Sequence, residues 1–191
     1  MATKLQLSDR PPIVEKPFLL DGTLCHLIPL SQGQYAVVDE SDYAWLMQWR
    51  WVAKWDAKSK RYYASRLSPE RKTGGSWYAS MHRQILGLSD LRVDPREGDH
   101  INHDGLDNRR RNLRIGTRRE NGCNRRVGKN NRSGFKGVRF RWNRWVAEIK
   151  TNGRKLHLGT FPTAEEAARV YDAAAAQHFG EFANTNLRKE R

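Results

Sequence analysis

The dipeptide Asn152-Gly153, set between two strand-like segments, is the feature that most restricts how this chain can fold. Asn-Gly favours a two-residue β-hairpin turn, because both residues accept a positive φ angle. The flanking segments RWVAEIKT and RKLHLGTF should therefore pair, with FKGVRF as a third strand. PTAEEAARVYDAAAAQHFG follows as a helix, with Thr163 and Glu166 at capping-box spacing and Gly180 at its end. Residues 135–187 thus predict a three-stranded antiparallel sheet packed on one helix.

Positive charge is concentrated in one part of the chain. The window from Arg109 to Lys155 holds 17 Lys/Arg and two Asp/Glu, a local net charge of +15 against +14 for all 191 residues. A solvated protein surface usually mixes both signs, whereas a binder of the phosphate backbone concentrates one. The window predicts nucleic-acid binding. A merely solubilising basic surface is the alternative, and the scarcity of acidic residues counts against it.

The N-terminal part is rich in aromatic residues. Residues 1–17 have the composition of a tail, and residues 18–81 contain short strand-like runs: LCHLIPL, QYAVVD, WRWVAKW, RYYASRL and SWYASMHRQ. Five of the seven tryptophans fall there, and we expect them to pack in a core. SDYAWLMQW reads as a short helix capped by Ser41, with Tyr43, Leu46 and Met47 on one face. There is no apolar run long enough for a membrane span and no signal peptide, which predicts a soluble intracellular protein.

Residues 82–126 contain the stretch DHINHDGLDNRRRNLR. NLRIGT reads as a strand and TRRENGCNRR as a helix, before the linker-like VGKNNRSG at 127–134. If the stretch is a hairpin, Asp99 and His100 end one strand, Asn112 begins the next, and Asn121 lies one turn into the helix. A carboxylate and an amide oxygen suit a hard cation such as Mg²⁺, and an imidazole suits a general base. A polar turn before a basic helix is the plainer interpretation.

The stretch resembles the HNH family of ββα-metal nucleases, through the motifs MHR, DHIN, GLDNRRRNLR and REN over residues 81–126. The resemblance implies that His100 is the general base and that Asn112 holds its loop by hydrogen bonds. It also implies that Asp99 and Asn121 bind one Mg²⁺ (or Mn²⁺) per active site. Asn121 in the last motif position matches the HNN-type members that occur in phage homing endonucleases. His82 and Arg83 match an upstream motif of the family, and either a scaffold role or contact with the scissile phosphate is open for them.

The C-terminal part resembles the ethylene-response-factor (APETALA-type) DNA-binding domain, through GFKGVRF, WVAEI, LGTFPTAEEAARVYDAAA and FANTN over residues 134–187. In that family the sheet enters the major groove of double-stranded DNA and the helix packs behind it. Val138, Phe140 and Ile149 should then point at the helix, while Glu148 either accepts from a cytosine amine or orients an arginine. The implied DNA contacts are Arg139, Arg141, Trp142, Arg144, Glu148, Lys150 and Arg154. Outside the sheet, the arginines that flank the nuclease stretch should grip phosphate: Arg109, Arg110, Arg125 and Arg126.

These features predict an α+β protein: a ββα-metal nuclease core with an aromatic-rich N-terminal β subdomain, plus a small three-stranded antiparallel sheet packed on one helix. The predicted segments are a tail (1–17), the N-terminal subdomain (18–81), the nuclease motif (82–126), a linker (127–134) and the DNA-binding domain (135–187). The predicted function is a site-specific, divalent-metal-dependent DNA endonuclease of homing type. A DNA-binding regulator with a vestigial nuclease motif is the alternative; a non-specific nuclease toxin fits the dedicated DNA-reading module less well. We expect a monomer with double-stranded DNA as partner, no membrane association and no small-molecule cofactor, encoded by a phage or mobile element and acting in the host cytoplasm.

Overall fold

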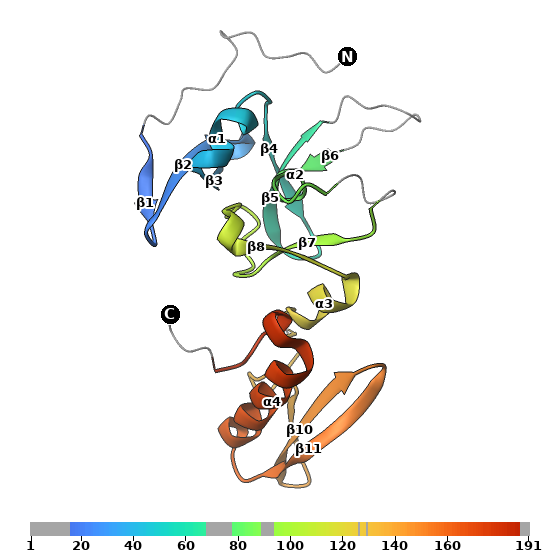
Figure 1. Cartoon of the computed structure of the whole chain (residues 1–191). Helices are drawn as coiled ribbons and strands as arrows, with labels where there is room; N and C mark the ends of the chain where they lie inside the picture. The colour runs from blue at the N-terminus through green and yellow to red at the C-terminus, as the bar shows by residue number, and fades with distance from the viewer. Residues whose placement is uncertain (1–15, 68–77, 89–93, 126, 129, 188–191) are drawn as a thin grey trace. The chain divides into compact units, whose positions relative to one another are not determined.

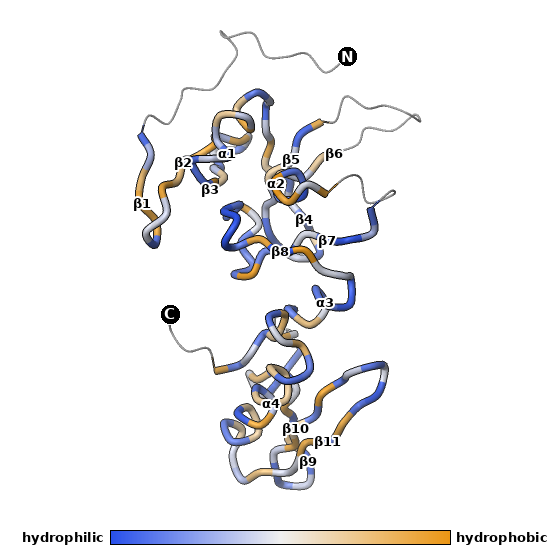
Figure 2. The backbone as a smooth tube through the Cα atoms, in the orientation of Figure 1, coloured by the Kyte–Doolittle hydropathy of each residue, from blue (hydrophilic) through white to orange (hydrophobic). Residues whose placement is uncertain are grey.

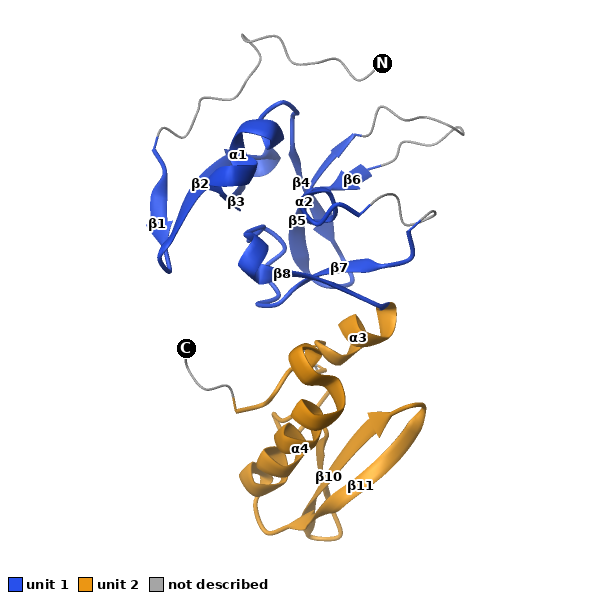
Figure 3. Ribbon diagram, in the orientation of Figure 1, with its two compact units in different colours: residues 1–117 blue, residues 118–191 orange. Residues whose placement is uncertain are grey.

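The structure, a computed structural model, describes residues 16–67, 78–88, 94–125, 127–128 and 130–187. The chain forms two compact units, residues 1–117 and residues 118–191 (Figure 3). Both combine short helices with small antiparallel sheets, so the predicted α+β class is confirmed. Among the described helices, none is long and apolar enough to cross a membrane.

The first unit opens with a three-stranded antiparallel sheet, β1 (Phe18–Leu20), β2 (Thr23–Pro29) and β3 (Tyr35–Asp39), with a short η2 turn (Ser31–Gly33) between the last two. Helix α1 (Glu40–Leu46) follows. Ile28, Val38 and Leu46 are fully buried in the core, and Tyr43 and Met47 pack against it, as the helical pattern predicts. The predicted cap at Ser41 is wrong. Asp39 occupies the N-cap position, without a capping bond from its side chain. Its carboxylate instead accepts the Arg110 backbone N–H at 2.7 Å.

A second antiparallel sheet comprises β4 (Val52–Asp56), β5 (Arg61–Leu67) and β6 (Tyr78–Ser80). The segment MHRQ, predicted as strand, forms the helix α2 (Met81–Ile85), because Met81 and Ile85 lie one turn apart and both bury in the core. Trp51 is buried there, and Trp45 and Trp49 pack against it. The packing prediction is wrong for Trp55, which is 48% exposed. Trp77 lies outside the described residues.

Strands β7 (Glu97–His100) and β8 (Leu113–Gly116) pair as a two-stranded antiparallel ribbon (Figure 1). The loop between them ends in a 3₁₀ turn, η3 (Arg110–Asn112). Two backbone hydrogen bonds tie this loop to β3: Val37 N–H to the Leu106 carbonyl at 2.9 Å, and Asn108 N–H to the Val37 carbonyl at 2.8 Å. The loop is therefore anchored to the first sheet.

The second unit begins with α3 (Arg118–Cys123) and continues with the antiparallel sheet β9 (Val138–Arg141), β10 (Arg144–Thr151) and β11 (Arg154–Phe161). Helix α4 (Ala164–Phe179) and the short η4 (Gly180–Phe182) complete it. Hydrophobic and hydrophilic stretches are interspersed along α4 (Figure 2). Its cap is the predicted one: the Thr163 hydroxyl accepts the Glu166 N–H at 3.2 Å, and Gly180 ends the helix. Asn152 and Gly153 both have positive φ angles, 50° and 77°, as the predicted turn requires.

The core between α4 and the sheet is built from small residues on the helix. Val138 and Ala147 meet Ala164, Ala167 and Ala168, and Ile149 meets Tyr171 and Ala175 further along. Phe140 lies on the same face of β9 as Val138, as predicted, but it does not join the core under α4. Its side chain is 57% exposed and packs against the Trp145 ring at 5.0 Å, near the end of the sheet.

The segment that the sequence suggests as a linker contains ordered hydrogen bonds. The Ser133 hydroxyl bonds to the carbonyls of Phe135 at 3.0 Å and Val138 at 2.8 Å. Upstream residues are tied to the same unit: the Lys136 ammonium bonds the Cys123 carbonyl, and the Asn184 amide donates to the Arg125 carbonyl at 3.0 Å. The division between the two units accordingly falls before α3.

Candidate functional site

His100 ends β7 and lies in the interior of the first unit. It is 5% exposed, and its Nε2 lies 3.3 Å from the Asn108 side-chain oxygen. Neighbouring residues of a strand point to opposite faces, so Asp99 and His100 diverge. In the β7–β8 register Asp99 lies opposite Arg114, and His100 lies opposite Leu113.

Two aromatic rings flank His100. The His82 ring, from α2, meets it edge-on with 4.8 Å between centroids, and the Tyr63 ring of β5 lies 5.8 Å away. Burial lowers the pKa of His100, although the Asn108 hydrogen bond and nearby carboxylates act in the opposite direction. Burial also holds the pKa of His82 well below its usual value, with further lowering by His100 and Arg83. Both imidazoles are therefore neutral near pH 7, and a neutral imidazole can accept a proton.

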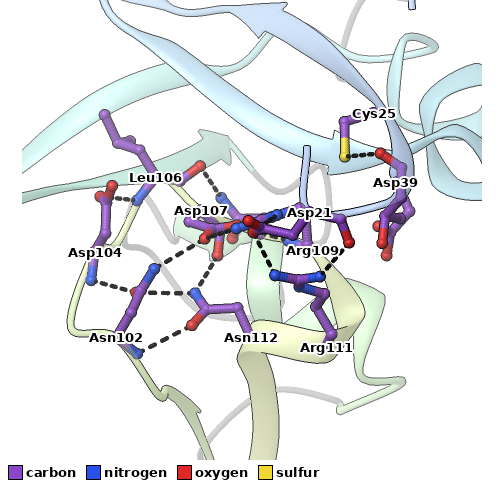
Figure 4. Close-up of polar contacts among 12 residues, drawn as sticks. Asp21, Cys25, Asp39, Asn102, Asp104, Leu106, Asp107, Arg109, Arg111 and Asn112 are labelled. Atoms are coloured by element: carbon purple, nitrogen blue, oxygen red, sulfur yellow. Dashed lines mark hydrogen bonds and ion pairs between the residues drawn. The ribbon is translucent and has the colours of Figure 1, made fainter. Parts of the chain in front are cut away.

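Asn112 holds the loop that follows His100 (Figure 4). Its amide nitrogen donates to the Asn102 side chain at 3.0 Å and to the Asp107 carbonyl at 2.7 Å. Its amide oxygen accepts the Asn102 backbone N–H at 3.0 Å. Asn102 in turn donates to the Asp107 carboxylate at 2.9 Å. Removing the Asn112 amide would leave several loop groups without their partners.

The three arginines that follow Asn108 are engaged within the protein. Arg109 is 6% exposed and pairs with Asp107 through two hydrogen bonds of 2.7 Å, and with Asp21 at 3.1 Å. Arg110 makes two bonds, 2.8 and 2.7 Å, to the buried Asp42. Arg111 pairs with Asp21 as well (Figure 4). The predicted phosphate contact is therefore wrong for Arg109, whose guanidinium is buried, and the Arg110 guanidinium is already held by a carboxylate.

The predicted metal ligands are not brought together within one unit. Asp99 lies in the first unit, where its Oδ2 accepts hydrogen bonds from Arg114 Nε at 3.1 Å and from Arg114 Nη2 at 2.7 Å. Asn121 lies on α3 in the second unit, so its partnership with Asp99 stays a prediction. Carboxylate and amide oxygens fit a hard divalent cation in chemical type. Arg114, however, competes for the Asp99 charge. The part of the chain that the structure describes gathers no group of three His, Cys, Asp or Glu as a metal site.

Arg83 and His82, for which two roles were open, differ in their surroundings. Arg83 is 7% exposed and donates to the backbone carbonyls of Arg96 at 2.6 Å and Asp94 at 3.3 Å. These bonds hold the chain that leads into β7, which is a scaffold role. His82 packs against Gly98, where an added Cβ would lie 2.7 Å from the imidazole carbon Cδ2.

In the second unit, the β9–β10–β11 register separates the two faces of the sheet. Cross-strand partners share a face, and alternate residues along a strand share it too. Val138, Ala147 and Ile149 face α4. The opposite, outer face carries the predicted contacts Arg139, Arg141, Arg144, Glu148 and Lys150. Arg139 and Glu148 form an ion pair, which favours the arginine-orienting role of Glu148. The Arg141 guanidinium lies over the ring of the 79%-exposed Trp142, 4.5 Å from its centroid.

The register changes one prediction and adds two residues to the outer face. Arg154 is the cross-strand partner of Thr151, two residues after Ile149, so it belongs to the face that carries α4. The outer face instead includes Lys155 opposite Lys150 and His157 opposite Glu148. Sequence reasoning missed both, although counting outward from the Asn152-Gly153 turn would have paired Lys155 with Lys150. Of the remaining predicted contacts, Arg125 is exposed, and Arg126 lies outside the described residues.

The second unit is similar to a known protein family. Residues 133–181 match the AP2 domain. Dehydration-responsive element-binding protein 2A of Arabidopsis thaliana is 49% identical over 71 residues, which is 35% of this chain and 21% of the relative. Ethylene-responsive transcription factor ERF084 of Arabidopsis thaliana is 61% identical over 57 residues, 28% of this chain and 22% of the relative. The resemblance predicted for the C-terminal part is thus confirmed.

A viral relative extends beyond that domain. The uncharacterized HNH endonuclease L560 of Acanthamoeba polyphaga mimivirus is 38% identical over 114 residues, 56% of this chain and 56% of the relative. Only 59 residues run from Ser133 to Arg191, so the similarity must include residues before the AP2 match. The chain spans about a fifth of the length of the two plant relatives and about half that of the viral one.

Proposed function

We propose that this protein is a site-specific DNA endonuclease of homing type. The first unit would hydrolyse a phosphodiester bond, and the outer face of the AP2-matching sheet would recognise the DNA sequence. The observation that carries the proposal is that His100 is buried and that the loop after it is held by hydrogen bonds from Asn112, in a chain that also contains an AP2 domain. The similarity to a viral protein named an HNH endonuclease supports it.

In this proposal His100 removes a proton from the water that attacks the phosphorus. A general base must be unprotonated and fixed in place, and burial together with the Asn108 contact provides both. Asn112 is a positioning residue, because its bonds fix the loop that starts directly after His100. Asp99 and Asn121 would hold a Mg²⁺ ion, which would supply charge stabilisation for the leaving oxygen. Binding of the ion requires that Asp99 share or exchange its Arg114 partner.

The outer face of the sheet suits the reading of DNA. Arginine can bind guanine through two hydrogen bonds, and an arginine held by a carboxylate is already oriented for it. Arg139 with Glu148 is such a pair. Arg141, Arg144, Lys150 and Lys155 add positive charge on the same face, without an excess of acidic residues.

Supercoiled plasmid and purified full-length protein test the proposal. We expect nicked or linear product with Mg²⁺, no product in excess EDTA, and a rate lower by about 10²–10⁴ for His100→Ala. A matched control is His178→Ala, which removes an exposed histidine from α4, on the side of the sheet opposite the outer face. DNA binding by His100→Ala, measured in EDTA, should equal that of the unaltered protein. Cleavage at the full rate by His100→Ala would refute the role of this histidine.

A sequence-specific DNA-binding regulator is the second candidate. The ion pair between Asp99 and Arg114 favours it, because the pair neutralises the proposed metal ligand. The two plant relatives are named as a dehydration-responsive element-binding protein and an ethylene-responsive transcription factor. The plasmid experiment separates the two candidates: a regulator would bind the DNA, and the DNA would stay intact at every Mg²⁺ or Mn²⁺ concentration.

A further inference from the structure

A pocket of about 430 Å³ lies on one face of the β4–β5–β6 sheet in the first unit. The register explains which face. Ala53 pairs with Ala64, and both are buried toward the core. Lys54 pairs with Tyr63, and Ser65 pairs with Ser80, so these residues point the other way, into the pocket. The pocket therefore lies on the polar face of a sheet whose opposite face is core.

The pocket lining combines aromatic rings, hydroxyls and a cation. Trp55, Tyr63 and Tyr78 supply the rings, and Ser65 and Ser80 supply hydroxyls. The Lys54 ammonium lies 4.6 Å from the centre of the Tyr78 ring and forms no ion pair with any described residue. Asp56 also lines the pocket, but its Oδ1 accepts the N–H groups of Lys58 at 2.7 Å and Ser59 at 3.1 Å and so holds the turn after β4.

The same pocket adjoins the proposed active site. His82 forms part of its wall, and the His82 ring contacts the His100 ring. Tyr63 lies between the pocket and His100 as well. His82 Nδ1 is buried and has no hydrogen-bond partner among the residues that the structure describes. Nothing in the hydrolysis step assigned to His100 uses this surface.

We propose that this pocket holds one unstacked nucleotide of the DNA strand beside the bond that His100 cleaves. The proposal rests on the proposed endonuclease function. Aromatic rings bind bases of any sequence by stacking, and a nearby lysine binds the backbone phosphate. The volume lies within the range of ordinary small-ligand sites. With one lysine and one aspartate, the pocket lacks the charge to hold a free nucleotide, so the nucleotide comes from a strand that the basic regions already bind.

Photocrosslinking in excess EDTA tests the pocket independently of cleavage. The probe is a mixed-sequence single-stranded oligonucleotide that carries 5-iodouracil in place of thymine, irradiated with the full-length protein. We expect crosslinked peptides that contain Tyr63 or Tyr78, and a loss of strand affinity of about tenfold for Tyr78→Ala. Tyr35→Ala is the matched control, since Tyr35 is 46% exposed against 40% for Tyr78 and lies on β3, in a different sheet of the unit. If Tyr78→Ala does not fold, Lys54→Gln should weaken strand binding by a few-fold.

The outcomes separate the pocket from the endonuclease. Crosslinks confined to residues 118–191, or equal losses for Tyr78→Ala and Tyr35→Ala, overturn the pocket while plasmid cleavage stands. Crosslinks at Tyr63 or Tyr78 from a protein that never cuts plasmid would support the pocket and refute the nuclease. Complete protection from crosslinking by millimolar deoxyadenosine monophosphate would make the site one for free nucleotides and would overturn the proposal.

Discussion

Burial gives Arg109 a structural role in place of the DNA contact that its sequence position suggests. In the sequence it belongs to a basic run, whereas in the fold its guanidinium lies among Asp107, Asp21 and the loop after His100. A buried charge that loses its partner costs far more than an exposed one. The identity of the partner could not be read from the sequence, because Asp21 lies 88 residues away.

Arg109→Ala should lower the free energy of unfolding of the first unit by about 3–5 kcal/mol, because Asp107 would stay buried without its cation. Arg111→Ala is the control: Arg111 also pairs with Asp21, but its side chain is 45% exposed, so we expect a loss below about 1 kcal/mol. Urea unfolding followed by tryptophan fluorescence measures both, since five of the seven tryptophans precede residue 82. Similar urea midpoints for the two variants would contradict the stabilising role of the buried Arg109–Asp107 ion pair.

The stability of the first unit should depend on pH through the carboxyl group of Asp107. Burial acts to raise the pKa of Asp107, but hydrogen bonds and the charge of Arg109 outweigh it and lower the pKa. The stabilisation is therefore complete above the unfolded value of about 3.9 and is lost as the pH falls through the lower folded value. Between pH 5 and pH 2 the unaltered protein should lose more stability than Asp107→Asn, which has no carboxyl to protonate. Parallel urea midpoints of both proteins across this pH range would contradict the assignment.

At the scale of elements, local signals in the C-terminal unit agree with tertiary packing. Asn152-Gly153, the Thr163 cap and the Gly180 stop each appear where the residues alone place them. Prediction was poorer where tertiary contacts decide the structure. MHRQ became helix because Met81 and Ile85 bury together, and Ser41 lost the cap to Asp39. The face of Arg154 was missed because it depends on pairing across the turn.

Gly137 and Gly153 are both in a conformation that favours glycine, but only Gly137 is also closely packed. Both have positive φ, 74° and 77°, which costs a side-chain-bearing residue about 1–2 kcal/mol. A Cβ at Gly153 would meet open space, whereas one at Gly137 would lie 2.0 Å from the Tyr171 ring and 2.7 Å from the Glu148 carbonyl. Gly137→Ala should thus lower the free energy of unfolding by roughly 2–5 kcal/mol. Gly153→Ala should lower it only by the conformational cost of about 1–2 kcal/mol. Hydrogen exchange resolved by peptide should show β9 and α4 opening in Gly137→Ala alone.

For the whole molecule, DNA binding depends on which of the positive charges are accessible at the surface. The basic window contains 17 Lys/Arg, yet Arg109, Arg110 and Arg114 are bound to carboxylates. The sequence predicted the presence and sign of the charge correctly, but it could not show which of these cations remain accessible. In the candidate active site, the hydrogen bonds of Asn112 agree with the role that the resemblance to HNH nucleases implied, whereas the Asp99–Arg114 pair emerged only from strand register.

Arg154 and Lys155 are adjacent, exposed and equally charged, but they lie on opposite faces of the sheet. Lys155→Ala should weaken DNA binding and reduce the slope of log affinity against log salt by about one, the value for a single lost phosphate contact. Arg154→Ala should leave both nearly unchanged. Affinity for one duplex across a salt series measures the two slopes. A larger effect of Arg154→Ala would mean that the DNA meets the other face.

The ion pairs of Arg109, Arg110 and Arg111 also determine which parts of this chain can be transferred to another protein. Arg110 reaches back 68 residues to Asp42, and Arg111 reaches back 90 residues to Asp21. A fragment that began at His82 would carry these arginines without their carboxylates and the His100 loop without its β3 anchor. The segment proposed as the nuclease therefore cannot be transferred alone, and it can be inherited only together with the sheet before it. The AP2-matching unit makes its own core and caps its own helix, so recombination can exchange it and join the first unit to a different DNA-binding unit.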